Sequence, residues 1–415
     1  MDFDDLVIGS GLAALGAVLG LLAEGDRRVA VFCGGSENRF YYYDSRQSVP
    51  CAFLGEGGLG SHWHGVIPTG WHNNFGAASD EDFVAMFRRY YPHTDVRDRL
   101  GSPMLFVPWR AVRPAHELRR LAASHGPHRL SLIREAALQL RFNERGVTVA
   151  SASGVRRAAR VWVAAGALHT PALLASTLGM GAVRDHVSDH VFCYVGQVDG
   201  QSRPAVSHCR DGVFFPVTYD ALVTALYTLR PATFSFRRLD FGIEQRVVFG
   251  LPTGNVLAKL VRRMSPGLLV EAFYNRFGLF AGAATHSVYA QVLVRDGYRF
   301  CAEPRPLQAC SKRIRIATDA ARDAQPFAGL QPSRRPEIYL PGIHLHHSLD
   351  LDALARAGVN ADDSPVQVVD ASVLTEIGPD HHAFKMMLAA HDRARRAGHS
   401  NIPGQASRTV IEPAR

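Results

Sequence analysis

The chain has 415 residues, of which 47% are apolar and 20% charged, and this composition is typical of soluble globular proteins rather than disordered ones. At roughly 150 residues per domain, the length predicts two domains. The formal net charge is +8, but the basic residues are scattered in pairs such as Arg262-Arg263, without interleaved aromatic residues. This pattern excludes an extended nucleic-acid surface and favours an anionic substrate or an acidic partner.

The N-terminus begins with Asp2, Asp4 and Asp5 rather than with positive charge, which is unlike a secretory signal. Residues 6–23 are apolar, but several glycines interrupt them, and this argues against a membrane span. We therefore expect a cytoplasmic protein with no membrane partner. The six cysteines show no C-x-x-C spacing, so the sequence predicts neither a zinc knuckle nor a redox pair.

The first segment predicts a strand, a glycine turn and a helix. Residues 6–8 are an apolar strand, and Gly9, Gly11 and Ala14 follow at G-x-G-x-x-A spacing at the start of an apolar helix. In such a turn the glycines let the backbone approach a pyrophosphate, and the alanine lets the helix pack closely on the sheet. The helix N-terminus favours the anion through its unpaired N–H groups and its dipole. The turn alone is a weak signal, because an ordinary core helix can also follow a glycine turn.

The second strand strengthens the nucleotide-binding interpretation. Residues 29–32 are apolar and follow at the spacing of a β-α-β unit. The acidic residue that usually contacts the ribose at the end of this strand is missing, because Cys33 stands there. The sequence therefore leaves the ribose contact unassigned.

Helices and short strands are predicted in the next part of the chain. Residues 80–125 are expected to be mainly helical. Residues 138–142 and 147–149 then alternate as strands on either side of a turn. A last apolar strand at 161–164 runs into a glycine junction and a helix from Ala172, which is suited to rejoining the nucleotide-binding sheet.

The middle of the chain predicts a second sheet. Strand-like runs at 191–198, 288–294 and 313–317 lack any G-x-G turn, so we assign them to a separate, antiparallel, substrate-facing sheet. Residues 400–415 are expected to be a loosely held tail. We expect a discontinuous nucleotide-binding domain of residues 1–90, 126–186 and 341–415, and a substrate-binding domain of residues 91–125 and 187–340.

Three separated segments together resemble the glucose-methanol-choline (GMC) family of flavin oxidoreductases. They are the turn at Gly9 to Ala14, the run Ala164-Ala-Gly-Ala-Leu-His-Thr-Pro171 and the run Val368-Val-Asp-Ala-Ser-Val-Leu374. The resemblance covers about half of the chain. It implies an α/β fold with a Rossmann-like FAD-binding domain and a second, mainly antiparallel β-sheet substrate domain. It further implies that Gly166, Asp370 and Ala371 contact the cofactor.

A glycine-rich loop looks like the pyranose-oxidase branch of this family. It contains Gly58 and ends in Ser61, His62 and Trp63. In that branch a histidine before a tryptophan can be bonded to the flavin 8α-methyl group, so the resemblance implies a covalent bond between FAD and His62 as one of two alternatives. The alternative is a noncovalent flavin with the His62 ring packed against its dimethylbenzene edge.

A histidine pair is implied by the same resemblance. In the family a histidine or asparagine lies nine residues after the serine of the Asp-Ala-Ser strand, which gives His381, with His382 beside it. The upstream partner is His344 by its register, while the Gly-Thr motif that usually follows is absent, so His346 or His347 could be the counterpart. An imidazole with its ordinary pKa of about 6.5 is suited to accept the hydroxyl proton while a hydride passes to flavin N5.

The resemblance therefore implies an FAD-dependent enzyme that oxidises a CH–OH group of a small alcohol, with O2 or another electron acceptor. Three other functions are weighed against it. One is non-redox lyase or cyclase chemistry with a structural FAD, and another is an inactive binding protein. The third is a metal site, for which the candidate ligands are His344, His346, His347 and His381. No carboxylate or cysteine cluster accompanies these histidines, so no metal is assigned.

Overall fold

The computed structural model places most of the chain, and the structural statements below concern the residues that it describes. They are residues 2–23, 25–35, 39–43, 50–63, 65–70, 78–143, 146–199, 206–219, 223–231, 285–299, 307–324, 328–333, 339–375, 377–378 and 381–399. The expected tail at 400–415 lies outside them, as does part of the expected substrate-binding domain.

The first sheet has the strand order β7-β2-β1-β10-β9-β8, with β20 also paired to β10. Its strands are β1 (Phe3–Ile8), β2 (Val29–Phe32), β7 (Leu130–Ile133), β8 (Gln139–Asn143), β9 (Gly146–Ser151), β10 (Gly154–Val163) and β20 (Val366–Val368). β7, β2, β1, β10 and β20 run parallel, while β8 and β9 form an antiparallel extension on β10. The carboxyl ends of the parallel strands therefore meet at one edge.

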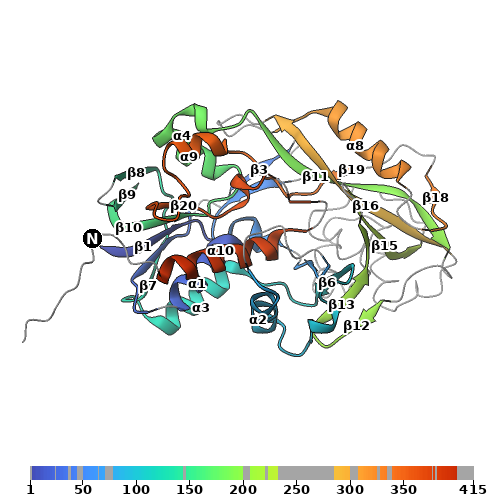
Figure 1. Ribbon diagram of the computed structural model, residues 1–415, viewed down its shortest axis with the longest axis horizontal. Coiled ribbons are helices and arrows are strands. Elements are labelled where there is room, and N and C mark those ends of the chain that lie inside the picture. The colour runs from blue at the N-terminus through green and yellow to red at the C-terminus, as the bar shows by residue number, and fades with distance from the viewer. Residues whose placement is uncertain are drawn as a thin grey trace, which may run out of the picture.

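Helices cover both faces of this sheet (Figure 1). They are α1 (Leu12–Ala23), α3 (Pro114–His125) and α10 (Ala383–His399) on one face, and α4 (His169–Leu178) and α9 (Leu351–Arg356) on the other. Successive side chains of β1 point to opposite faces of the sheet. Val7 packs in the core with α1 and α10, while Leu6 and Ile8 pack with α4 and α9. Strands buried on both sides read as continuous apolar runs, which is why the sequence identified them.

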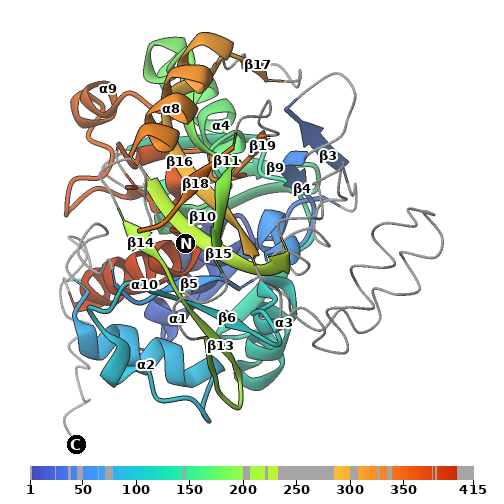
Figure 2. The ribbon, with the colours of Figure 1, turned by 90° about the vertical axis from the view of Figure 1, so that its right-hand side faces the viewer.

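The second sheet is antiparallel and has the order β14-β15-β16-β11-β18, with β17 on β16 and β19 on β11. Its strands are β11 (His186–Asp199), β14 (Thr218–Tyr219), β15 (Val223–Pro231), β16 (Thr285–Arg299), β17 (Gln308–Ala309), β18 (Gln331–Pro332) and β19 (Tyr339–Pro341). α8 (Ser311–Asp323) packs on β16 and β11 (Figure 2). The expected α/β class with a second, mainly antiparallel sheet is confirmed.

Smaller elements complete the described structure. A third sheet contains β5 (Ile67–Pro68), β6 (Met104–Pro108), β12 (Ser207–His208) and β13 (Gly212–Pro216), and a hairpin contains β3 (Arg39–Tyr42) and β4 (Pro50–Leu54). The remaining helices are α2 (Asp80–Tyr90) and the short helices η1 (Gly58–His62), η2 (Arg97–Arg99), η3 (Met180–Ala182) and η4 (Ala371–Val373). In the residues that the structure places, no helix is both long and apolar enough to cross a bilayer.

One predicted strand is wrong, and one predicted helical region contains an unexpected strand. Residues 313–317 are helical within α8 rather than a strand, because Ile314 and Thr318 are buried one helical turn apart while Ile316 is 60% exposed. Residues 80–125 are mainly helical as expected, in α2, η2 and α3, but the strand β6 lies between η2 and α3. β6 is buried along its whole length and pairs with β13, a partner more than 100 residues later that no local pattern indicates.

Helix α10 approaches α1 closely along two glycines. A β-carbon on Gly16 would collide with the carbonyl oxygen of Met387, and one on Gly20 with that of His391. α10 begins immediately after His381 and His382, so this contact also fixes where those two side chains lie.

Gly16→Ala is expected to lower the free energy of unfolding by roughly 2 kcal/mol through overpacking, although alanine favours a helix over glycine by about 1 kcal/mol. Urea denaturation would measure the change. Gly181→Ala is the matched control, because a β-carbon there meets nothing within 4 Å, and it should leave stability nearly unchanged. Equal effects of the two substitutions would contradict the close packing of α1 on α10.

Candidate active site

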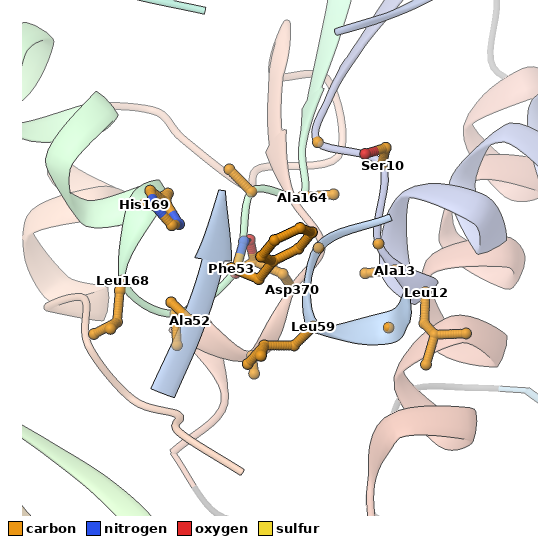
Figure 3. Close-up of a pocket in the computed structure, with 18 of the residues that line it drawn as sticks. Ser10, Leu12, Ala13, Ala52, Phe53, Leu59, Ala164, Leu168, His169 and Asp370 are labelled. Carbon is orange, nitrogen blue, oxygen red and sulfur yellow. The ribbon is translucent and has the colours of Figure 1, made fainter. Parts of the chain in front are cut away.

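A cavity of about 520 Å³ lies at the carboxyl edge of the parallel strands. The residues that follow β1, β2, β10 and β20 line it, and these include Gly9, Cys33, Gly166 and Asp370. Figure 3 shows Ser10, Leu12 and Ala13 on one side of the cavity and Leu168 and His169 on the other, with Phe53 and Leu59 between them. The crevice outside the carboxyl ends of parallel strands is where α/β sheets bind nucleotides.

The glycine turn after β1 has the geometry that the sequence predicts. Gly9 has φ +114°, and a β-carbon there would collide with the carbonyl oxygen of Ala164. Its N–H donates to the carbonyl of Phe32 over 2.9 Å, so the turn is held against both neighbouring strands. Ala14 is fully buried and packs α1 on the sheet instead of lining the cavity.

Three other glycines, Gly11, Gly58 and Gly166, have open space beside them in the cavity. A β-carbon on Gly11 or Gly58 would meet only backbone atoms, at 3.8 and 3.9 Å respectively, and one on Gly166 would meet nothing within 4 Å. Each lines the cavity, so side chains at these positions would project into space that a ligand can use. This is the cradle that a flat, elongated cofactor requires.

Ser10 ties the turn to its neighbours and was missed from the sequence. Its hydroxyl donates to the carbonyl of Cys33 over 3.1 Å and accepts the N–H of Gly57 over 2.8 Å. It is the unspecified residue of the G-x-G motif, and only the packing of the loop against β2 shows its role.

Cys33 is a buried, neutral thiol. Burial, together with the negative charge of Glu56, raises its pKa to about 12. Cys33 therefore lines the cavity without supplying the anionic oxygen that an acidic residue would offer a ribose. Glu56 itself forms ion pairs with Arg134 over 3.3 Å and Arg119 over 3.9 Å.

The glycine-rich loop places His62 and Trp63, but not Ser61, in the cavity wall. The Ser61 hydroxyl instead donates to the carbonyl of Glu56 over 2.9 Å. The His62 ring packs against the rings of Phe40 and Phe53, with centroids 5.1 and 5.2 Å away. The Trp63 indole N–H is buried and has no hydrogen-bond partner among the described residues, so a polar atom of a ligand would satisfy it.

Asp370 joins two segments that are 200 residues apart. One carboxylate oxygen accepts the N–H of Gly166 over 2.7 Å and the hydroxyl of Thr170 over 2.5 Å. The other accepts the N–H and the hydroxyl of Ser372, over 2.9 and 2.5 Å. Asp370 therefore fixes the two junctions that form one wall of the cavity, while neighbouring Ala371 lines it directly.

Three candidate histidines from two segments meet at the cavity. His344 follows β19, while His381 and His382 precede α10, and all three line the cavity. The His344 ring centroid lies 5.3 Å from that of His381 and 4.8 Å from that of His382, in edge-on arrangements. Burial and the neighbouring histidines hold the pKa of His382 well below its usual range, so its imidazole is neutral.

The two alternative histidines point elsewhere. His346 is buried and its Nδ1–H donates to the carbonyl of His344 over 2.9 Å, while His347 contacts Arg184, whose Nη1 lies 2.9 Å from its Nδ1. Neither lines the cavity. The four histidines weighed as metal ligands therefore do not form one cluster among the described residues. The histidines whose ring nitrogens lie within 4.8 Å of one another there are His190, His344 and His382.

His190 is a fourth histidine at this site, and it was missed from the sequence. It lies fully buried in β11, with its Nδ1 3.2 Å from Nδ1 of His344. A signal did exist, because Ser188, Asp189 and His190 lie directly between Val187 and the apolar run that begins at Val191, and buried polar residues need partners.

Asp189 supports both histidine segments. Its Oδ1 accepts the backbone N–H groups of His190 and His344, each over 2.7 Å, and its Oδ2 accepts the hydroxyl of Tyr43 over 2.6 Å. Burial raises the pKa of Asp189 to about 7, although these hydrogen bonds oppose the shift.

Asp189 gives a prediction about pH. Between about pH 4 and about pH 7 the carboxyl group of Asp189 is protonated in the folded protein but ionised in the unfolded chain. The contribution of Asp189 to the free energy of unfolding therefore falls as the pH rises through this range. Asp189→Asn keeps the shape without the titration, so wild type should lose stability relative to this variant between about pH 5 and about pH 8. Urea denaturation at both values tests this, with the exposed Asp185→Asn as control. Parallel stability curves for wild type and Asp189→Asn would contradict the raised pKa.

Solved structures with the same fold include pyridoxine 4-oxidase from Mesorbium loti. It matches 96% of this chain and 100% of its own chain, with a TM-score of 0.50 and 12% identity. A fungal aryl-alcohol oxidase and an FAD-dependent oxidoreductase from Chaetomium thermophilum are also similar, each with a TM-score of 0.48 and 12% identity. The former covers 96% of this chain and 99% of its own, and the latter 94% and 98%.

These likenesses show the fold alone. No profile of a known protein family matches the sequence, and no curated protein matches it either. The fold implied by the GMC resemblance is confirmed, because the pyridoxine 4-oxidase structure is matched over its whole length. Fold and cavity together define an α/β protein with a cavity at the carboxyl edge of its parallel strands and a second, antiparallel sheet.

Proposed function

We propose that the chain is an FAD-dependent oxidoreductase of the GMC family that oxidises a CH–OH group of a small molecule to a carbonyl. The observation that carries this proposal is that one cavity begins at the G-x-G turn and ends at His344, His381 and His382. A nucleotide cradle and a group of proton acceptors thus share one space. Fold alone would not support a function, whereas this juxtaposition does.

FAD fits the residues that line the cavity. Gly9 and Gly11 at the start of α1 would hold its pyrophosphate, Gly58 and Gly166 leave room for its flat ring, and the indole N–H of Trp63 would donate to it. When bound, FAD would supply the redox chemistry by accepting a hydride. The protein supplies orientation and proton handling.

His344 is proposed as the group that takes the hydroxyl proton of the substrate, with His381 or His382 hydrogen-bonding the same oxygen. A neutral imidazole has a lone pair for this proton, and the adjacent His382 is kept neutral by its surroundings. Edge-on packing of the three rings restricts each to a narrow range of orientations, which fixes the substrate oxygen relative to the bases.

The first experiment is reconstitution with FAD, followed by a panel of primary and secondary alcohols. Because one matched structure is a pyridoxine 4-oxidase, the panel includes pyridoxine, and benzyl alcohol is added as a simple aromatic alcohol. We expect a yellow protein whose flavin absorbance bleaches on anaerobic mixing with the right alcohol. A colourless protein that takes up no FAD would overturn the proposal. Product formation with the flavin still oxidised would instead support lyase or cyclase chemistry.

A further prediction concerns His62. Its ring forms part of the cavity wall, so His62→Ala should reduce the FAD retained through gel filtration. Acid precipitation of the wild type then separates the two possible roles. Flavin in the precipitate, with one FAD added to the intact mass, shows a covalent bond, whereas flavin in the supernatant shows packing. Unchanged FAD retention in His62→Ala would contradict both roles.

A further inference from the structure

His190 lies on β11 and contacts His344, which follows the neighbouring strand β19 of the same sheet. Its Nε2 lies 2.7 Å from the carbonyl oxygen of Gly378, and its Nδ1 lies 3.2 Å from Nδ1 of His344. The segment carrying His344 is held close to β11, because the N–H of Gly342 donates to the carbonyl of His190 over 2.6 Å. A β-carbon on Gly342 would lie only 2.6 Å from Cβ of His190, so glycine permits this approach.

The hydrogen-bond partners of His190 determine which nitrogen carries its proton. A carbonyl oxygen only accepts, so Nε2 of His190 must donate to Gly378. Complete burial, reinforced by the adjacent His344 and His346, holds the pKa of His190 well below its usual range, so its ring is neutral and Nδ1 has a lone pair. The short contact between the two Nδ1 atoms is then a hydrogen bond only if His344 donates it.

This arrangement selects one form of His344. A neutral imidazole that carries its proton on Nδ1 has its lone pair on Nε2. We propose that His190 is a positioning residue that holds His344 as the Nδ1–H tautomer, so that Nε2 is the atom that takes the substrate proton. This inference rests on the proposed function, in which His344 is the base. Asp189 supports it by binding the backbone N–H groups of both histidines through one oxygen.

The proton balance of this step is simple. The substrate O–H bond breaks and its proton joins Nε2 of His344, while the Nδ1–H bond of His344 remains intact. The resulting imidazolium still donates from Nδ1 to the lone pair of His190, and this hydrogen bond becomes charge-assisted and therefore stronger. His190 itself neither gains nor loses a proton. The logic is that of a base whose second nitrogen is oriented by a fixed partner.

The test is NMR of protein labelled with ¹⁵N-histidine, in which correlations between ring carbon-bound protons and nitrogens identify each tautomer. Single substitutions assign the signals. We expect His344 to show a protonated Nδ1 and an unprotonated Nε2. His190→Phe keeps an aromatic ring in the buried site but removes the hydrogen-bond acceptor. In this variant the proton of His344 should no longer be confined to Nδ1. His190→Asn can return an acceptor oxygen near the position of Nδ1 and should restore the Nδ1–H tautomer.

Activity gives a second measurement. His190→Phe should lower the rate of flavin reduction at saturating substrate with little change in the substrate concentration for half-maximal rate, and His190→Asn should recover part of it. His186→Phe, on the same strand, is the matched control and should change neither the tautomer nor the rate. The proposal would be overturned if His344 of the wild type carried its proton on Nε2. It would also be overturned if the tautomer of His344 were the same in wild type and in His190→Phe.

The two proposals fail separately. The tautomer can be measured without substrate, so a failure of FAD uptake or oxidation with the tautomer intact would refute only the proposed function. Active enzyme with the wrong tautomer would refute only the role of His190.

A metal ion shared by both Nδ1 atoms is the competing explanation of the 3.2 Å contact, since metal–nitrogen distances of about 2.0–2.1 Å place neighbouring ligands roughly this far apart. We expect no uptake of Co²⁺ after EDTA treatment. Uptake of one equivalent that is lost in His190→Phe would overturn the hydrogen-bond assignment.

Discussion

Replacing His344 with alanine is expected to slow flavin reduction by roughly 10²–10⁴-fold, the range over which a positioned acid or base accelerates a reaction. The substitution removes the imidazole whose ring contacts those of His190, His381 and His382. Stopped-flow absorbance under anaerobic conditions, with the best alcohol from the panel, measures this rate directly. FAD content should change little, because the nucleotide turn lies at the other end of the cavity.

The neighbouring histidine provides the matched control. His347→Ala removes an imidazole three residues away whose partner is Arg184 and which does not line the cavity. It should leave the rate of flavin reduction within about threefold of wild type, since substitutions away from a site are usually small in effect. A near-normal rate in His344→Ala together with a large loss in His347→Ala would reverse the assignment between the two candidate positions.

The site depends on both sheets being correctly placed. His190 belongs to β11, and His344 follows β19, which pairs with the same strand. His381 and His382 instead precede α10, which is fixed on α1 through Gly16 and Gly20. The cluster therefore forms only where the antiparallel sheet meets the helices that cover the first sheet. Substitutions in either sheet should alter the geometry without touching a histidine.

The sequence predicted those parts of the site that depend on local order. Gly9 and Gly166 follow apolar strands, and such strands are recognisable because burial on both faces makes them continuously apolar. His381 was found by counting from Ser372 in a recognised segment. These inferences needed only spacing along one stretch of chain, which the sequence contains explicitly.

The remaining parts depend on pairing between distant segments. His190 meets His344 across 154 residues, and Ser10 meets Gly57 across 47 residues. No periodicity encodes such contacts. Residues 313–317 show that a local pattern can also mislead. Their alternating arginine and isoleucine residues have the period of a strand, but the tertiary contacts of α8 bury one helical face around Ile314.

Asp370→Ala is expected to cost at least about 3 kcal/mol of the free energy of unfolding, since it leaves several buried donors without an acceptor at about 1–3 kcal/mol each. The donors are the N–H of Gly166, the hydroxyl of Thr170, and the N–H and hydroxyl of Ser372. Because these groups join the strand end of β10 to that of β20, the cavity wall should loosen and FAD retention should fall in parallel. Urea denaturation and flavin absorbance after gel filtration measure the two effects.

Two further variants determine the origin of the effect. Asp370→Asn keeps the shape and one acceptor oxygen, but places an amide group opposite Gly166 and Thr170, so it should lie between wild type and Asp370→Ala in both measurements. Asp350→Ala removes a carboxylate that accepts one backbone N–H, from Ala353 at the start of α9, and should cost only about 1 kcal/mol with FAD retention unchanged. If Asp370→Ala cost no more than Asp350→Ala, the four hydrogen bonds of Asp370 could not be what holds the two strand ends together, and the wall of the cavity would have to be fixed by packing alone.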